Sequence, residues 1–95
     1  TTGTPPLTTA ELAPPAEEPW KAAGLYARIA RFTLPFNATG HPAISLPLGQ
    51  TDAGLPVGVQ LVAPMSREDR LLRVAAWLEA ACPWSDRRPA VYATR

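Results

Sequence analysis

The sequence of 95 residues contains a single cysteine and a single histidine, and this scarcity excludes two kinds of structure. Cys82 has no partner for an internal disulfide, which fits a reducing compartment. Cys82 and His41 together supply too few ligands for a zinc site. The sequence therefore predicts neither a disulfide framework nor a metal centre.

Long hydrophobic runs and a charge excess of one sign are also missing. No apolar stretch approaches the ~20 residues needed to cross a bilayer, and no charged segment followed by an apolar run indicates a signal peptide. Nine basic and eight acidic residues give a net charge of +1, too little to attract nucleic acid or an anionic membrane. GxGxxG and GxxxxGK[ST] motifs are absent, so no cofactor is predicted. We therefore expect a cytoplasmic protein that binds neither nucleic acid nor membrane.

Proline, in contrast, is abundant, with 12 residues in 95, or about 13% against a usual ~5%. Five of the prolines fall in residues 1–19. Because each fixes its own φ and biases the preceding residue away from the helical region, we predict a Pro-rich loop there. The sequence opens on Thr1 and its only methionine is Met65, so we expect a segment of a longer protein.

Hydrophobic periodicity predicts two helices, at residues 20–31 and 66–82, followed by a polar tail at residues 83–95. Ser66 is a suitable N-cap for the second helix, and two acidic residues follow in the first turn. Cys82 ends the apolar stripe of this helix, so we expect an inert thiol in the core. The stripe comprises Leu71, Val74, Ala75, Leu78 and Cys82.

Alternating apolar residues predict a strand pair within residues 43–62, with strands at Ala43–Leu48 and Val57–Val62 joined as a hairpin. Ile44, Leu46 and Leu48 are expected on one face. Pro47 cannot donate a ladder hydrogen bond, so the first strand is an edge there or contains a bulge. The preceding residues 32–42, with two prolines and a glycine, are expected to form a loop in which Gly40 permits a positive φ.

Two helices and one hairpin place the chain in the α/β class. Because these elements bury only a small core, we expect them to form part of a larger sheet. A two-stranded ribbon alone is marginal in water. The nearly continuous apolar run from Val57 to Ala63 indicates a strand that is covered on both faces.

No residue of this chain is predicted to be catalytic. His41 has no nucleophile and carboxylate close in sequence with which to act as a base. Ser45 lacks the GxSxG elbow that would expose its hydroxyl. Arg87 and Arg88 either bind a carboxylate together or belong to a solvated tail.

Two strings carry a resemblance to a known family. FTLPFNATGHPAISLPLG and GLPVGVQLVAP, followed by an Arg/Leu-rich helix ending in PW, resemble the C-terminal portion of the amidase signature family. The resemblance covers residues 1–88 and is strongest over residues 32–64. It implies an α/β enzyme with a large mixed sheet wrapped by helices, of which this chain is the C-terminal part.

The resemblance also implies a function, the hydrolysis of carboxamides by a serine nucleophile, a second serine in a cis peptide and a lysine base. The Gly/Ser-rich stretch that supplies those serines in the family is absent here, and Lys21 is the only lysine. The catalytic residues are therefore expected outside this chain. In relatives that take fatty or aromatic amides, the segment similar to residues 32–37 borders the acyl channel. The implied substrate-binding residues are Phe32, Thr33 and Phe36, with Thr2 and Thr4 as further candidates.

Several alternatives stay open at this stage. The two phenylalanines also fit plain core positions. The expected partners are the remainder of the amidase chain and a small-molecule amide, and the family resemblance also allows a homodimer. An amidotransferase A subunit shares the fold but usually continues well past the last helix, which favours the hydrolase. A catalytically silent binding or structural module is the third interpretation.

Overall fold

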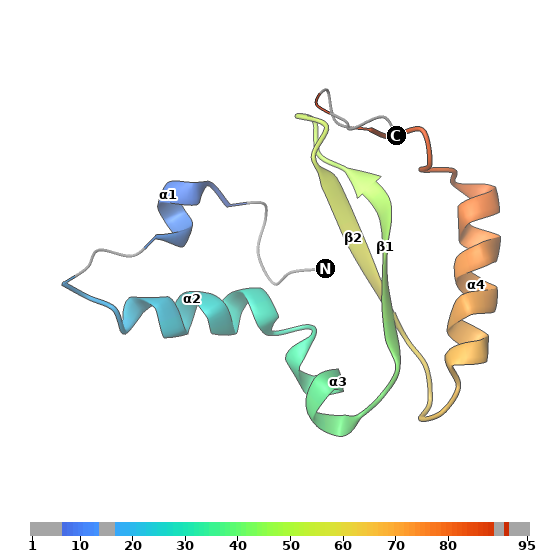
Figure 1. Ribbon diagram of the computed structural model, residues 1–95, viewed down its shortest axis with the longest axis horizontal. Coiled ribbons are helices and arrows are strands. Elements are labelled where there is room, and N and C mark those ends of the chain that lie inside the picture. The colour runs from blue at the N-terminus through green and yellow to red at the C-terminus, as the bar shows by residue number, and fades with distance from the viewer. Residues whose placement is uncertain (1–6, 14–16, 89–90, 92–95) are drawn as a thin grey trace.

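A computed structural model describes residues 7–13, 17–88 and 91 of the chain. Within these residues the fold is a mixed α/β arrangement of a two-stranded antiparallel sheet and four helices (Figure 1). In chain order the elements are α1 (Thr9–Leu12), α2 (Lys21–Ala30), α3 (Leu34–Thr39), β1 (Ala43–Gln50), β2 (Pro56–Val62) and α4 (Glu68–Ala81).

The sheet confirms the predicted hairpin and contains an irregularity at the predicted position. Leu46 of β1 lies opposite Val59 of β2, but the next pair joins Gly49 to Val57, so β1 has an extra residue around Pro47. A proline that cannot donate to the ladder is accommodated at such a bulge. The bulge interrupts strict alternation along β1, so the single face predicted for Ile44, Leu46 and Leu48 does not continue past Leu46.

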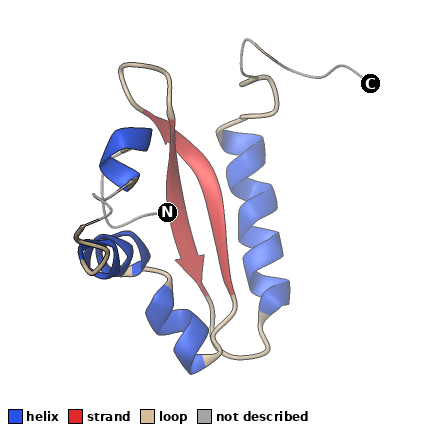
Figure 2. Ribbon diagram, turned by 60° about the vertical axis from the view of Figure 1, so that its left-hand side comes forward, coloured by secondary structure: helices blue, strands red, loops and turns tan. Residues whose placement is uncertain are grey.

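The small core lies between β1 and α4. Four apolar side chains of the described residues are buried. α4 runs alongside β1, while α2 and α3 lie on the other side of the sheet (Figures 1 and 2). Leu71 and Ala75 are one turn apart, so they present a single face of α4 to this core. The buried residues are Leu46, Ala63, Leu71 and Ala75.

Much of the apolar surface is uncovered by the described residues. Val57 and Val59 of β2 remain 41% and 40% exposed, so the described residues do not cover this strand on both faces. On α4, Leu72 and Trp77 are more than 60% exposed on the side away from the core. A surface of this kind is typical of an element that packs against further structure.

Two short helices correct the sequence prediction, since α1 lies in the expected Pro-rich loop and α3 in the expected loop at residues 32–42. α1 forms because Thr8 and Glu11 make a reciprocal capping box that satisfies otherwise unpaired N–H groups. In α3 a proline occupies the first turn, where a missing N–H is harmless. Gly40 ends α3 with φ 72°, which confirms the predicted positive φ.

The start of α4 also differs from the prediction. Arg67, and not Ser66, is the N-cap residue, and Ser66 takes a left-handed φ of 60° in the turn before the helix. Arg67 does not cap with its side chain; its guanidinium instead makes two 2.7 Å hydrogen bonds to the Asp69 carboxylate. This interaction lowers the pKa of Asp69 to about 2 from its ordinary 3.8. Both acidic residues, Glu68 and Asp69, lie in the first turn as predicted.

The end of α4 corrects the expectation that Cys82 is a core residue. The helix ends at Ala81, and the backbone of Cys82 leaves the helical conformation with φ −132° and ψ 72°. The side chain therefore does not continue the apolar stripe, and Cys82 is exposed. Val74 of the same stripe is also exposed, because the buried face of α4 is narrower than the stripe.

Candidate functional site

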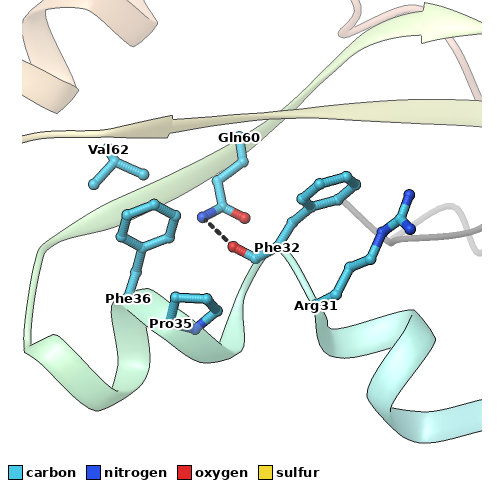
Figure 3. A pocket seen from close by; sticks show the side chains of 6 residues that line it. All are labelled: Arg31, Phe32, Pro35, Phe36, Gln60 and Val62. Carbon is cyan, nitrogen blue, oxygen red and sulfur yellow. Dashed lines mark hydrogen bonds between the residues drawn. The ribbon is translucent and has the colours of Figure 1, made fainter. Parts of the chain in front are cut away.

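A cavity of about 450 Å³ opens between β2 and the α2–α3 junction (Figure 3). This volume lies within the range of small-molecule sites, roughly 300–1,000 Å³. The walls are mainly apolar, with one guanidinium and one side-chain amide among them. The lining residues are Arg31, Phe32, Pro35, Phe36, Gln60 and Val62.

The helical side of the cavity contains two of the three predicted substrate-binding residues, Phe32 and Phe36. They are four residues apart, and α3 begins between them, so both rings reach the same opening (Figure 3). Thr33, the third, is not a lining residue. Its Oγ1 donates to the carbonyl oxygen of Ala30 over 3.2 Å, which stabilises the end of α2.

The sheet side of the cavity is formed by Gln60 and Val62, which point from one face of β2 toward α3 (Figure 3). Residues two apart share a face of a strand, which explains why this pair lines the opening together. Ser45 lies opposite Gln60 in the hairpin register. Gln60 and Val62 were not predicted from the sequence as lining residues; the signal available was their spacing within GVQLV.

One hydrogen bond joins the two sides of the cavity. Gln60 Nε2 donates to the carbonyl oxygen of Phe32 over 3.1 Å, between residues 28 apart in sequence (Figure 3). Gln60 Oε1, the other end of the amide, is buried and has no hydrogen-bond partner among the described residues. Since a carbonyl oxygen can only accept, this bond fixes which end of the amide faces Phe32.

A cation and an aromatic edge contact complete the site. The guanidinium carbon of Arg31 lies 4.7 Å from the centre of the Phe32 ring, within the range of a cation–π interaction. The Phe36 ring meets His41 edge to face, with centroids 6.4 Å apart. His41 Nδ1 lies 2.9 Å from Thr39 Oγ1. This contact orients the imidazole, but it joins His41 to no carboxylate.

A second cavity of about 670 Å³ lies at the turn end of the hairpin. Arg87 and Arg88 both line it, together with Trp84. Arg87 Nη1 donates to the carbonyl oxygen of Pro47 over 3.1 Å. Arg87 is therefore bound to the backbone of β1, which corrects the interpretation of this segment as a wholly solvated tail.

Thr2 and Thr4 lie outside the described residues. The described part of the chain contains no group of three or more His, Cys, Asp or Glu side chains that could hold a metal ion. None of its helices is long and apolar enough to cross a membrane.

The family of this chain follows from comparison with known proteins. The family model described as Amidase matches residues 1–72, so the chain belongs to the amidase family. The chain is 60% identical over 62 residues to a 6-aminohexanoate-cyclic-dimer hydrolase of Pseudomonas sp. (strain NK87), a match that covers 65% of this chain and 13% of that protein. It is 47% identical over 57 residues to the A subunit of the glutamyl-tRNA(Gln) amidotransferase of Cyanothece sp. (strain PCC 7425 / ATCC 29141), covering 60% of this chain and 12% of that one.

A solved structure gives the same result for the fold. The structure of 6-aminohexanoate cyclic dimer hydrolase superposes with a TM-score of 0.64 at 57% sequence identity, covering 70% of this chain and 14% of that chain. A second structure of that enzyme, complexed with substrate, matches equally well. The chain thus spans about one seventh of the length of these relatives.

Proposed function

We propose that the complete protein containing this segment is an amidase that hydrolyses a carboxamide C–N bond. Water adds to the carbonyl carbon, the C–N bond breaks, and the products are a carboxylate and an amine. The observation that carries the proposal is the 60% identity to a cyclic-dimer hydrolase, against 47% to the amidotransferase protein.

The catalytic residues of the proposed enzyme lie outside this chain. A serine nucleophile, a second serine in a cis peptide and a lysine base are the expected set. The single lysine, Lys21, forms an ion pair with Glu18. The ion pair engages the one lysine of the chain, which supports a role as scaffold and pocket wall for this segment.

Phe32 and Phe36 form the part of the wall that contacts the acyl portion of the substrate in this proposal. Their rings line an opening with few polar groups. Transfer of an apolar acyl chain from water into this opening is therefore favourable. Thr33 belongs to the same site as a supporting residue, because its hydroxyl donates to the Ala30 carbonyl oxygen and stabilises the end of α2, next to Phe32.

The substrate proposed for the first assay is the 6-aminohexanoate cyclic dimer, on which the relatives act by name. Ring opening of this compound produces one new amine and one new carboxylate for each bond cleaved. We expect the full-length protein, the remaining amidase chain included, to release primary amine from it. The measurement is amine release followed by mass spectrometry of the linear product.

A matched pair of variants tests the pocket wall in the same assay. Phe36→Ala is expected to raise KM several-fold, because it removes an apolar surface from the acyl site. Leu34→Ala is the control, since Leu34 lies in the same helix, is 59% exposed and does not line the cavity. An equal change of KM in both variants would contradict the assignment of the wall.

The alternative functions make different predictions. An amidotransferase A subunit would transfer ammonia from glutamine to a glutamyl-tRNA only with its partner subunits present. A silent module would bind amides without cleaving them. Cleavage of the cyclic dimer by the purified full-length protein, without tRNA or partner subunits, would contradict both.

A further inference from the structure

Gln60 combines a buried oxygen that has no hydrogen-bond partner among the described residues with a bond across the cavity, and this combination is unfavourable for stability alone. Leaving a buried acceptor without a donor costs about 1–3 kcal/mol. The bond at the other end of the amide reaches Phe32, an exposed residue whose carbonyl can also be hydrated. An apolar side chain of similar length would avoid the penalty at Oε1. The position therefore calls for a reason beyond folding stability.

The reason lies in what the bond holds. Phe32 connects α2 to α3, and the helices on this side of the sheet make few contacts with it compared with α4. The bond from Gln60 fixes the Phe32 backbone at β2, and the Phe32 ring is also held by the Arg31 guanidinium 4.7 Å from its centre. The distance between the two walls of the cavity thus depends on the Gln60 side chain.

We propose that Gln60 is a positioning and specificity-determining residue, whose side-chain amide sets the width of the cavity by holding the Phe32 backbone against β2. The inference rests on the proposed amidase function, because it assigns the cavity to the acyl group of an amide. Fixed walls favour amides with a flat or bulky apolar acyl group that contacts both sides. A small acyl group contacts one wall only, so its binding affinity depends little on the hydrogen bond between Gln60 and Phe32.

The test compares benzamide with propionamide in the full-length protein and its Gln60→Met variant. Loss of one neutral hydrogen bond is expected to raise KM for benzamide about three- to tenfold, with kcat within about twofold. KM for propionamide is expected to change by less than about twofold. The urea midpoint of unfolding is expected not to fall, because the variant also removes the unpaired oxygen.

Gln50→Met is the matched control. Gln50 Nε2 also donates to a backbone carbonyl, that of Gly54 over 3.2 Å, but at the turn end of the hairpin. It is expected to leave the benzamide-to-propionamide ratio of KM unchanged. The same change of ratio in both variants would overturn the inference.

Gln60→Glu provides a readout that a purely structural role would not affect. Its carboxylate cannot donate to the Phe32 carbonyl, whereas its protonated form can. The KM for benzamide is therefore expected to fall toward the wild-type value as pH decreases through the pKa of the introduced carboxyl group, relative to the wild-type profile. A pH profile parallel to wild type, or equal losses for both amides in Gln60→Met, would show that Gln60 does not position the wall.

The two proposals fail separately in this design. If the wild-type protein cleaves neither of these amides nor the cyclic dimer, the proposed function is wrong, and dissociation constants from ligand-observed NMR replace KM. The same selective three- to tenfold weakening of benzamide binding in Gln60→Met would then still support the inference. Absence of benzamide binding to the wild-type protein would overturn it.

Discussion

Arg87 Nη1 donates to the carbonyl oxygen of Pro47 over 3.1 Å, although the two residues are 40 positions apart in sequence. Pro47 lies within the register shift between Leu46 and Gly49, where the regular pairing of β1 with β2 is interrupted. The guanidinium thus provides a donor to a carbonyl group at the bulge and connects the residues that follow α4 to β1.

Arg87→Gln is therefore expected to loosen this connection. Because the bond is exposed, the free energy of unfolding of the full-length protein should fall by less than about 1 kcal/mol. Arg28→Gln is the control, since Arg28 lies at the end of α2, on the other side of the sheet from α4. Urea unfolding measures both variants. A larger loss in Arg28→Gln would contradict the role of Arg87.

Gly40→Ala and Gly24→Ala are expected to change stability in opposite directions. Gly40 has φ 72°, where alanine costs about 1–2 kcal/mol, and a Cβ there would meet Met65 Cε at an ordinary 3.8 Å. The cost is therefore conformational. Gly24 lies inside α2 with nothing within 4 Å of a Cβ, so alanine should stabilise by roughly 0.5–1 kcal/mol. Urea unfolding of the full-length protein decides, and the same sign for both variants would refute the argument.

Asp69 should titrate well below an ordinary aspartate. The hydrogen bond from Arg67 lowers its pKa to about 2, so its contribution to stability is complete above the unfolded value near 3.8 and is lost as pH falls through about 2. An NMR titration of the carboxyl carbon measures this directly. Arg67→Gln is expected to return the midpoint toward 3.8, and Arg73→Gln to shift it much less, because Arg73 acts only through charge. A midpoint near 3.8 in the wild-type protein would contradict the ion pair.

Thr8→Ala should destabilise α1 locally. The variant loses the hydroxyl that accepts from the Glu11 N–H over 3.3 Å and donates to Glu11 Oε2 over 2.8 Å. Loss of such a cap costs about 0.5–2 kcal/mol. The Leu12 amide, which donates to the Thr8 carbonyl oxygen, is expected to exchange faster with deuterium. Thr9→Ala, at the first position of the same helix, serves as control and should leave Leu12 protected.

The elements predicted correctly from the sequence are those with enough residues to repeat a pattern. α2, α4 and both strands each show their apolar period more than once, and no observed bound differs from the predicted one by more than two residues. α1 and α3 span four and six residues, hardly more than one turn, so periodicity could not reveal them. Their signals were local: the spacing of Thr8 and Glu11 fits a capping box.

The residues that line the cavity were also predicted only in part from the sequence. Phe32 and Phe36 were inferred from a family resemblance, and both line the cavity. Gln60 and Val62 were missed, since a strand pattern tells which residues share a face but not which helix that face meets. The exposed position of Cys82 was missed because an apolar stripe predicts burial only for residues that are helical. α4 ends at Ala81, one residue before Cys82.

α3 has a fixed boundary at each end. A proline occupies its first turn, and Gly40 terminates it in the left-handed conformation, so the helix can neither start earlier nor run on at low cost. Only two residues then separate Gly40 from β1. An insertion or deletion here would displace Phe36 from the cavity. Descendants of this sequence can therefore exchange side chains along the stretch far more freely than they can gain or lose a codon within it.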